Sequence, residues 1–381
     1  MARFVRKLSK KIFIWINLLA VAVFLLACMT GYLTPGRYWY IAVLGVVFPH
    51  LLLVLVGFVI FWAGFKSRWF LLSLIALVIG WSQVSRVVGM HPFNGFTLEK
   101  KEGTLRVMHW NVARFDQMNV TASGNRNRQG DLDYIRKMNP DIICMAEFLE
   151  SNNPREIKQN IPYFRDSLHF PYYFLAPDYR RWDGLYMHGV AIFSKYPLLD
   201  TQRIRFAGPE NAKAGESLIH ADADVDGKRI RIFATHLQSL RFDGNDYSVI
   251  KDVTNVENGA VNKSKGVLRK FRQAYFLRSK QAEIVKREMD ASPYPSVLCA
   301  DFNDVPNSFT YQKIRGHHHD AFLSAGFGLG RTFSSLSPTL RIDYIFTDPG
   351  IDVLQFKKTV LPFSDHYPLV ADLRLADPAR H

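Results

Sequence analysis

An acidic, amide-containing motif ends an apolar run in the stretch Ser296-Val297-Leu298-Cys299-Ala300-Asp301-Phe302-Asn303-Asp304. The uncharged residues before Asp301 predict a buried strand, and polar groups at the end of such a strand are costly as structure but useful as chemistry. The i, i+2 spacing puts Asp301 and Asn303 on one face of an extended chain, where a carboxylate can orient and deprotonate water. The structural alternative is an Asx turn, with Asp304 as the residue that caps the next helix.

Five more short polar motifs occur before and after this stretch. They are His109-Trp110-Asn111-Val112, Met145-Ala146-Glu147, Thr235-His236-Leu237, Arg341-Ile342-Asp343-Tyr344 and Ser364-Asp365-His366. The first four end an apolar run or lie within one, and the last opens such a run. Together the six motifs supply carboxylates, amides and imidazoles, which are the groups that a divalent-metal phosphodiester hydrolase needs.

Carboxylate and amide oxygens in three of these motifs predict a metal site. Glu147 directly follows the predicted strand 141–146, and Asn111 ends the strand before it. Magnesium binds one or two carboxylates and keeps several waters, so Glu147 and Asn111 can share one ion. Asp365 is expected to point toward the same metal. Each motif alone would be explained equally well by an ordinary turn Asn or a surface Glu.

Two imidazoles, His236 and His366, can stabilise the charge that grows on a phosphate or move a proton. Such a histidine needs an acid that fixes its tautomer. Asp343 is an acid in a mostly apolar run, so it needs a partner, and His366 is the natural candidate. The acid that orients His236 stays open, with Asp178 and Asp183 as options.

Three further segments are candidates for substrate binding. Arg180 and Arg181 precede the predicted strand 188–194, and an Arg there can clamp a phosphate, although a surface pair explains them equally well. The polar segments 113–129 and 239–264 follow directly after Asn111 and His236, where long loops often bind substrate. Plain disorder is the alternative for both segments.

The charge of the chain is concentrated at its N-terminus. Residues 1–98 carry nine Lys or Arg and no acid, so the total of +14 leaves only +5 for residues 99–381. The pI of about 9.6 is therefore weak evidence that the C-terminal part binds nucleic acid.

Three uncharged stretches, 12–36, 38–65 and 69–85, predict three transmembrane helices. The first two exceed the roughly 20 residues that cross a bilayer, and the third can span it if Arg86 snorkels. Five Lys or Arg precede the first stretch, one follows it and two follow the second. The positive-inside rule therefore predicts a cytoplasmic N-terminus and an extracytoplasmic location from about residue 90 onward. A cleaved signal peptide is disfavoured because two more spans follow.

We expect an anchor over residues 1–90, a linker over 91–104 and a catalytic domain over 105–381. Helices are predicted over 130–138, 152–160 and 265–290. Strands are predicted over 105–112, 141–146, 171–176, 188–194, 217–225, 229–236, 296–301, 341–347 and 367–374. This mixture of hairpins and helices predicts an α+β domain in which two mixed sheets pack face to face with helices outside.

The six motifs, in this order, resemble the endonuclease/exonuclease/phosphatase superfamily over about residues 104–376. That group includes pancreatic-type deoxyribonuclease, abasic-site endonucleases, neutral sphingomyelinases and inositol polyphosphate phosphatases. The resemblance implies a four-layered α/β sandwich and a Mg²⁺ or Mn²⁺ site. The anchor also looks like that of uncharacterised bacterial membrane proteins of the superfamily, which implies an integral protein of the bacterial inner membrane with a periplasmic catalytic domain.

The resemblance also implies roles for individual residues. Glu147 is the principal metal ligand, helped by Asn111 and Asp365. Asp301 and Asn303 handle the nucleophilic water and the phosphate. His366, paired with Asp343, and His236 stabilise the pentacovalent transition state. The chain departs from the pattern at Ala113, where abasic-site endonucleases carry an acid, and at Ala300, where a Gly is usual.

We therefore expect a membrane-anchored, metal-dependent phosphodiesterase in which water attacks phosphorus in line. The substrate stays open between a lipid headgroup, which the anchor favours, and nucleic acid, which the domain charge of +5 supports only weakly. An inositol phosphate or another phosphomonoester is a third option. The competing class is a non-catalytic membrane scaffold on the same fold, and the complete set of acids, amides and imidazoles argues against it.

Overall fold

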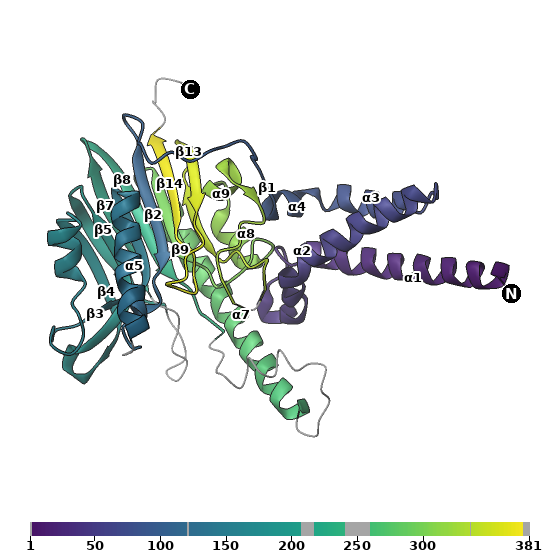
Figure 1. The fold of residues 1–381 in the computed structure, drawn as a ribbon, viewed down its shortest axis with the longest axis horizontal. Helices are drawn as coiled ribbons and strands as arrows, with labels where there is room; N and C mark the ends of the chain where they lie inside the picture. Colours follow the sequence, from purple (N-terminus) through teal and green to yellow (C-terminus); the bar gives the residue numbers. More distant parts are fainter. Residues whose placement is uncertain (1, 120–121, 207–216, 241–259, 336, 376–381) are drawn as a thin grey trace.

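The computed structural model describes residues 2–119, 122–206, 217–240, 260–335 and 337–375. A β-rich body carries a bundle of apolar helices that projects from one side (Figure 1). The N-terminus lies at the far end of this bundle, and the last strand of the chain lies in the β-rich body.

The projecting bundle is formed by the residues for which the sequence predicted a membrane anchor, and we call it the anchor below. It consists of α1 (Ala2–Cys28), α2 (Pro35–Gly64), α3 (Phe70–Ile79) and α4 (Trp81–Val87). Within the described residues, α1 and α2 are long and apolar enough to cross a membrane, and α3 with α4 makes a third candidate, although the pair is bent by 70°. The bend falls at Gly80, where an added Cβ would lie 2.6 Å from the ring of Phe24. Close contact with α1 therefore requires a glycine at this bend.

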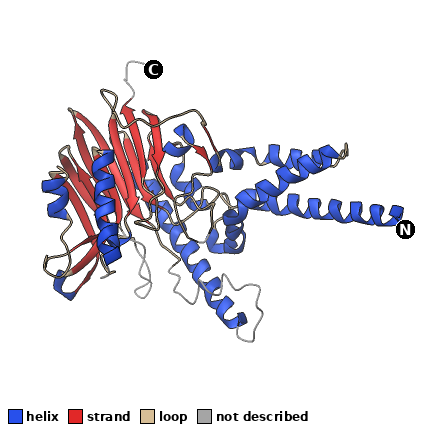
Figure 2. Cartoon of the chain, viewed as in Figure 1, coloured by secondary structure: helices blue, strands red, loops and turns tan. Residues whose placement is uncertain are grey.

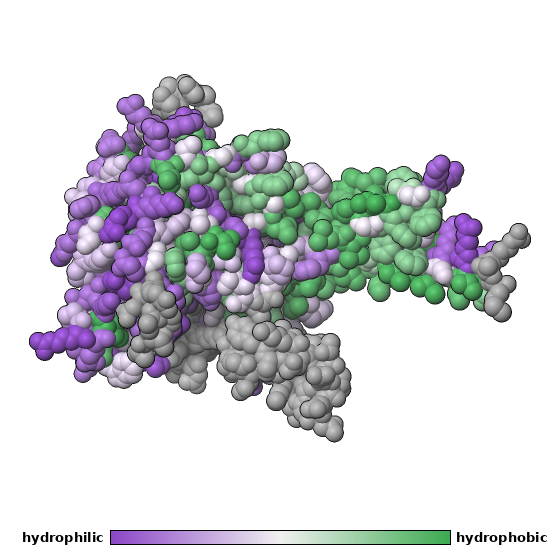
Figure 3. Space-filling model, in the orientation of Figure 1, coloured by the Kyte–Doolittle hydropathy of each residue, from purple (hydrophilic) through white to green (hydrophobic). Residues whose placement is uncertain are grey.

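Hydropathy separates the two parts of the molecule. Figure 3 shows apolar residues along the visible face of the bundle and hydrophilic residues over the body and at the far ends of the helices. The loop between α2 and α3 carries Lys66 and Arg68. An apolar waist between two polar ends is the pattern expected of helices that cross a bilayer.

Two six-stranded sheets form the body. The first has the order β13-β14-β2-β3-β5-β4 and the second the order β10-β12-β9-β8-β7-β6. The strands of the first sheet are β2 (Leu105–Asn111), β3 (Ile142–Glu150), β4 (Tyr172–Arg181), β5 (Tyr186–Ser194), β13 (Ile351–Lys358) and β14 (Leu369–Leu375). Those of the second are β6 (Leu198–Ile204), β7 (Leu218–Val225), β8 (Lys228–His236), β9 (Ser296–Asp301), β10 (His319–Asp320) and β12 (Asp343–Thr347).

The sheets pack face to face with helices on their outer faces (Figure 2). The core between them contains Val107 and Cys144 from the first sheet and Ile232 and Cys299 from the second. On the outer faces lie α5 (Ala122–Met138) against the first sheet and α7 (Ala260–Asp290) with α8 (Phe309–Arg315) against the second. A short helix, α9 (Ala321–Ala325), packs near β13. The two packed mixed sheets confirm the prediction from the strand and helix pattern, and the arrangement is the four-layered α/β sandwich that the family resemblance implied.

Each predicted strand overlaps an observed one, but five strands of the described residues were missed: three two-residue strands, at Gly89–Met90, His319–Asp320 and Phe327–Gly328, and the longer β6 and β13. β6 and β13 lie at sheet edges, are mostly exposed or half-buried, and contain charged residues, so no apolar run marks them. The helix predicted over 152–160 is wrong. Local side-chain bonds, such as Asn153 Oδ1 accepting the Arg155 N–H at 3.1 Å, hold this segment in turns.

The polar loop predicted over 113–129 is wrong in part, because α5 begins at Ala122, whereas 120–121 lie outside the described residues. The second polar loop was predicted over 239–264. Of this segment, residues 241–259 lie outside the described residues, and α7 begins at Ala260.

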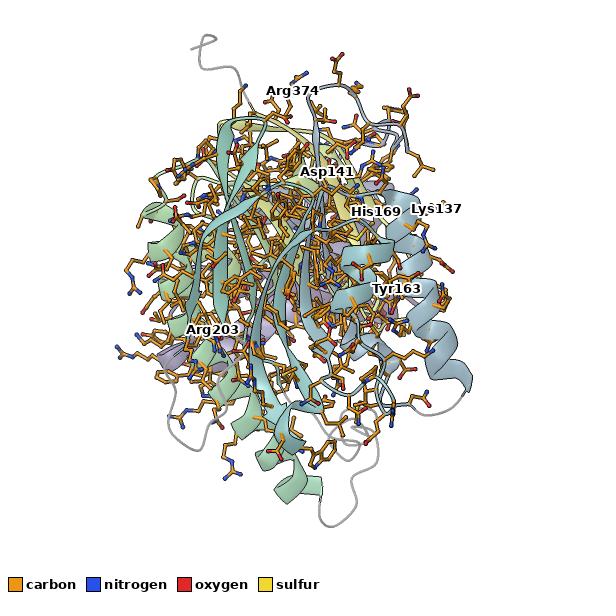
Figure 4. The ribbon with its side chains drawn as sticks, turned by 90° about the vertical axis from the view of Figure 1, so that its left-hand side faces the viewer. Lys137, Asp141, Tyr163, His169, Arg203 and Arg374 are labelled. Carbon is orange, nitrogen blue, oxygen red and sulfur yellow. The ribbon has the colours of Figure 1, made fainter. Side chains whose placement is uncertain are left out.

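Two pairs of parallel strands place the polar motifs. β2 runs parallel to β3 and β8 runs parallel to β9, with His236 directly opposite Asp301. Because the carboxyl ends of parallel neighbours meet at the same edge, the polar residues that end β2, β8 and β9 gather there, together with Glu147, which lies three residues before the end of β3. Seen from the side opposite the anchor, the body spreads its charged side chains, among them Lys137, Arg203 and Arg374 (Figure 4).

The anchor contacts the body through backbone pairing and hydrogen bonds near the start of the predicted linker. β1 (Gly89–Met90) pairs with β11 (Phe327–Gly328) as a small antiparallel sheet. Further along, the side chain of Gln355 on β13 accepts the Thr97 N–H at 2.9 Å. The division into residues 1–90, 91–104 and 105–381 stays a prediction, and these contacts tie its three parts together.

Candidate active site

A cavity of about 500 Å³ lies at the carboxyl ends of β2, β3, β8 and β9. Seven of the eight acid, amide and imidazole residues predicted for the site line it: Asn111, Glu147, His236, Asp301, Asn303, Asp365 and His366. The eighth, Asp343, is buried behind His366. The structure does not bring Arg180 and Arg181 to this cavity; both are exposed at the end of β4.

A bulge in β3 turns Glu147 toward the cavity. The register of β3 with β5 shifts between Met145 and Phe148, and Glu147 has a φ of 50°. Its side chain is 25% exposed within a strand that is otherwise buried. Bulges next to active sites commonly re-aim a side chain in this way.

Asn111 joins the two sheets at the floor of the cavity. Its Nδ2 donates to Asp301 Oδ2 at 3.0 Å, and its Oδ1 accepts the Ala113 N–H at 3.0 Å. A carbonyl oxygen has two lone pairs, so Oδ1 keeps one of them for a further ligand.

The Asp301 motif forms an Asx turn and also faces the cavity. Asp301 Oδ1 accepts the Asn303 N–H at 2.8 Å, and Asn303 has a φ of 52°. The following helix α8 is capped by Ser308, whose side chain accepts the Tyr311 N–H, and not by Asp304. The turn and the site are therefore the same structure.

His366 is held on the side chain of Asp343, the partner that the sequence suggested. Its Nδ1 lies 3.0 and 3.2 Å from the two carboxylate oxygens of Asp343, and 3.6 Å from Asp301 Oδ2. Burial opposes the charged imidazole, but the carboxylates of Asp343 and Asp301 outweigh it and raise the pKa of His366 to about 10. The imidazolium is thus the stable form at neutral pH.

The Ser364-Asp365-His366 motif is fixed to the end of β2. Ser364 Oγ donates to the carbonyl oxygen of Asn111 at 2.9 Å and accepts the His366 N–H at 3.1 Å. Trp110 Nε1 donates to the carbonyl oxygen of His366 at 3.0 Å. These bonds set the backbone from which His366 enters the cavity and leave the side chain of Asp365 exposed at its rim.

The second imidazole, His236, lies beside Asp301, with 3.6 Å between His236 Nε2 and Asp301 Oδ2. Of the two acids considered as its orienter, Asp178 accepts bonds from Arg203 and from Ser217. Asp183 lies in an exposed turn after β4. The carboxylate nearest to His236 that the structure identifies is thus Asp301 itself.

Three residues of the site were not predicted. His109 Nε2 lies 3.3 Å from Asp343 Oδ1, so Asp343 has two imidazole partners. Arg278 is 1% exposed, donates to the carbonyl oxygens of Gln238 and Asn303, and lies 3.6 Å from Asp304 Oδ2. A signal for Arg278 existed, because it is the one polar break in the apolar stripe of its helix.

Arg114 is the third unpredicted residue. It lies in a run of left-handed residues, Ala113–Asp116, which places its Nε 3.2 Å from Glu147 Oε2. Burial works against its charge, yet the carboxylates of Glu147 and Asp365 raise the pKa of Arg114 above its ordinary value. This side of the cavity therefore carries two carboxylates, those of Glu147 and Asp365, and Arg114 balances one of them.

The donor set on that side fits a hard divalent cation. Glu147 and Asp365 offer accessible carboxylates and Asn111 a neutral oxygen, which are the ligands that Mg²⁺ and Mn²⁺ prefer. Asp301, Asp343 and His366 also lie close enough together to hold a metal. Both groups of residues are therefore candidates for the divalent metal, and they differ in that Glu147 and Asp365 are open to solvent whereas Asp301, Asp343 and His366 are buried.

The sequence of the chain matches a family model described as the endonuclease/exonuclease/phosphatase family over residues 108–366. Since the match covers more than half of the chain, the protein belongs to this family. Its members are hydrolases that act on phosphoester bonds and generally use a divalent metal. A second model, described as a domain of unknown function, matches residues 10–87, and no curated protein matches the chain.

Two solved structures share the fold at low sequence identity, and a third is similar with a lower TM-score. An endonuclease/exonuclease/phosphatase from Beutenbergia cavernae DSM 12333 is 20% identical, covers 72% of this chain and 72% of its own, and has a TM-score of 0.51. A functionally unknown conserved protein from Enterococcus faecalis V583 is 15% identical, covers 71% and 100%, and has a TM-score of 0.50. The human Nocturnin catalytic domain with bound sulfate anion is 18% identical, covers 73% and 97%, and has a TM-score of 0.49.

Proposed function

We propose that this protein is a membrane-anchored, divalent-metal-dependent hydrolase of phosphodiesters. The observation that carries the proposal is the convergence of seven motif residues from both sheets on one cavity, joined by the Asn111–Asp301 hydrogen bond. Bringing these residues into one cavity does not stabilise the fold, because each polar group placed there costs free energy unless it finds a hydrogen-bond partner. Such a cluster is typical of a functional site.

The side chains divide the work between them. Asp301 orients the water that attacks phosphorus and accepts its proton, while Asn303 holds the phosphate. His366, kept charged by Asp343, and His236 stabilise the negative charge that grows on the phosphate oxygens. Mg²⁺ or Mn²⁺, held by Glu147, Asn111 and Asp365, would supply further neutralisation of that charge. Arg180 and Arg181 remain candidates for distant substrate contacts only.

The substrate class is a lipid headgroup or a nucleic acid. The anchor supports the lipid, because tethering keeps the cavity at a bilayer. We place the catalytic domain on the extracytoplasmic side of a bacterial inner membrane, because the basic residues gather at the opposite ends of the helices. An inositol phosphate or another phosphomonoester is the alternative substrate, and a non-catalytic scaffold is the alternative function.

The test uses the full-length protein in lipid nanodiscs with Mg²⁺ and then with Mn²⁺. Plasmid DNA, RNA, vesicles of sphingomyelin or phosphatidyl lipids, and inositol phosphates are offered in parallel, with Glu147→Ala and His366→Ala as inactive controls. Turnover of one class by the natural protein, abolished in both variants, is expected. Failure to turn over any class, together with no metal-induced rise in melting temperature, would favour the scaffold.

A further inference from the structure

We infer that the membrane helix α2 forms one wall of the catalytic cavity, and that this cavity takes a phosphodiester carrying a long apolar chain, a lipid of the adjoining leaflet. The inference rests on the proposed hydrolase function and names its substrate class. Net reaction with water gives a phosphomonoester and an alcohol: the water oxygen bonds to phosphorus, one ester P–O bond breaks, and the leaving oxygen receives a proton.

The residue of α2 in this wall is Val46. This residue lies in the helix with the highest hydropathy of the candidate spans, yet it lines the same cavity as Glu147 and Asp301. It packs on a small apolar cluster formed by Val305, Leu340 and Ile342. The cavity is thus polar where the motifs converge and apolar where the anchor closes it.

The contact between α2 and the motif loop is close and hydrogen-bonded. A Cβ at Gly45 would lie 2.7 Å from the carbonyl oxygen of Asn307, so the helix backbone touches the loop that follows the Asp301 motif. Asn307 Nδ2 donates to the carbonyl oxygen of Ala27 at 2.8 Å, and the Thr30 hydroxyl donates to the carbonyl oxygen of Asn307. The anchor therefore holds the cavity in one orientation.

A second attachment lies next to Asp343, the carboxylate that positions His366. Arg341 is buried, donates to Asp320 Oδ2 at 2.6 Å, and donates to the carbonyl oxygen of Arg86, in α4, at 2.7 Å. Two separate motif segments, after Asp301 and before Asp343, are thus bound to the anchor. A flexible tether would make neither contact.

The length of α2 sets the position of the cavity relative to the bilayer. Val46 lies 18 residues before Gly64, which corresponds to about 27 Å along a helix. With the basic loop at Lys66 and Arg68 on one face of a hydrocarbon core of about 30 Å, Val46 comes to the opposite boundary. The apolar wall then meets the level at which lipid phosphates and the first methylenes lie.

The outer surface beside the cavity is also suited to a bilayer. α7 contributes Phe271 and Tyr275 to the cavity and exposes Leu268 and Phe276, which are 47% and 46% accessible. Phe276 lies against the start of α2, since a Cβ at Gly36 would come 3.3 Å from its ring. Exposed Arg269 and Arg272 flank these residues, as is typical of a helix at a lipid interface.

The test compares two chromogenic diesters that differ only in their chain, 4-nitrophenyl hexadecyl phosphate and 4-nitrophenyl methyl phosphate. Full-length protein in nanodiscs with Mg²⁺ is expected to show at least tenfold higher kcat/KM for the hexadecyl ester. Val46→Trp, which fills the apolar wall, is expected to lower the hexadecyl-to-methyl ratio about tenfold. The matched control is Val47→Trp on the neighbouring exposed position, which should leave this ratio unchanged.

The outcomes separate the inference from the proposed function. Equal kcat/KM for both esters, or an unchanged ratio in Val46→Trp, would overturn the lipid assignment while leaving the hydrolase intact. Preferential cleavage of plasmid DNA over the hexadecyl ester would overturn it in favour of a nuclease. No hydrolysis of either ester or of DNA would refute the proposed function and the inference with it.

Discussion

The two sides of the cavity differ in how tightly they are held. On the first-sheet side, Glu147 stands in a left-handed bulge with a quarter of its side chain exposed, and Asp365 is exposed at the rim. On the second-sheet side, Asp301 and Asp343 are 0% and 1% exposed and bind neighbouring imidazole or amide groups. The first arrangement suits a ligand that exchanges with solvent, and the second suits a group whose protonation and direction must stay fixed.

The largest effect is expected from removing the Glu147 carboxylate on the solvent-exposed, first-sheet side of the cavity. Glu147→Gln is expected to lower hydrolysis by at least ~10³-fold and to abolish the rise in melting temperature on adding Mg²⁺, because a neutral amide holds the cation poorly. Thermal unfolding with and without Mg²⁺ measures this, with the exposed Glu156→Gln as control. An undiminished Mg²⁺ response would move the metal to the buried side.

On the buried, second-sheet side of the cavity, removing a charged group should lower the free energy of unfolding. Arg278→Met leaves Asp304 and two carbonyl oxygens buried without their cation, which costs about 3–5 kcal/mol of unfolding free energy. Thermal unfolding of the protein in nanodiscs measures the loss, and the exposed Arg272→Met on the same helix is the control. Equal melting temperatures for the two variants would contradict this role of Arg278.

Asp343 tests whether the buried side acts on chemistry without holding the metal. Asp343→Asn removes the charge that keeps His366 protonated and oriented, so activity should fall by about 10²-fold. The Mg²⁺-induced rise in melting temperature should persist. A parallel loss of activity and of the Mg²⁺ response would show that the two sides form one metal site; the exposed Asp133→Asn is the matched control.

Asp131 on α5, outside the cavity, is a reference for Asp343, because Asp131 is also a buried acid but has no imidazole partner among the described residues. Burial, with help from Asp116, raises the pKa of Asp131 to about 8, against an unfolded value of about 3.9. Neither of its oxygens has a hydrogen-bond partner among the side chains that the structure describes.

A carboxyl with a raised folded pKa contributes its stability below about pH 4 and loses it as pH rises toward 8. Asp131→Asn should therefore match the natural protein near pH 4 and exceed it by about 1–3 kcal/mol near pH 8. Melting temperatures across this range measure the difference. A constant gap at all pH values would mean that Asp131 does not titrate on unfolding.

The sequence predicted the sandwich because its buried strands are continuous apolar runs with sharp polar ends. β9 is the clearest case, and β2, β3 and β8 follow the same pattern. Edge strands such as β6 carry no such signal, since solvent tolerates polar residues on both of their faces. The helix prediction over 152–160 was wrong because side-chain hydrogen bonds to the backbone compete there with helix formation.

By itself the sequence determined the apolar N-terminal helices, the packed sheets and the residue types of the candidate site, because hydropathy and strand ends are local properties of the chain. Apart from the Asp343–His366 pair, which the sequence suggested, only the tertiary structure decided which residues meet. Arg114 reaches Glu147 through a left-handed turn, His109 shares Asp343 with His366, and Val46 enters the cavity from the apolar helix α2. Contacts of this kind depend on backbone bulges and on packing between distant segments, and no spacing along the chain encodes them.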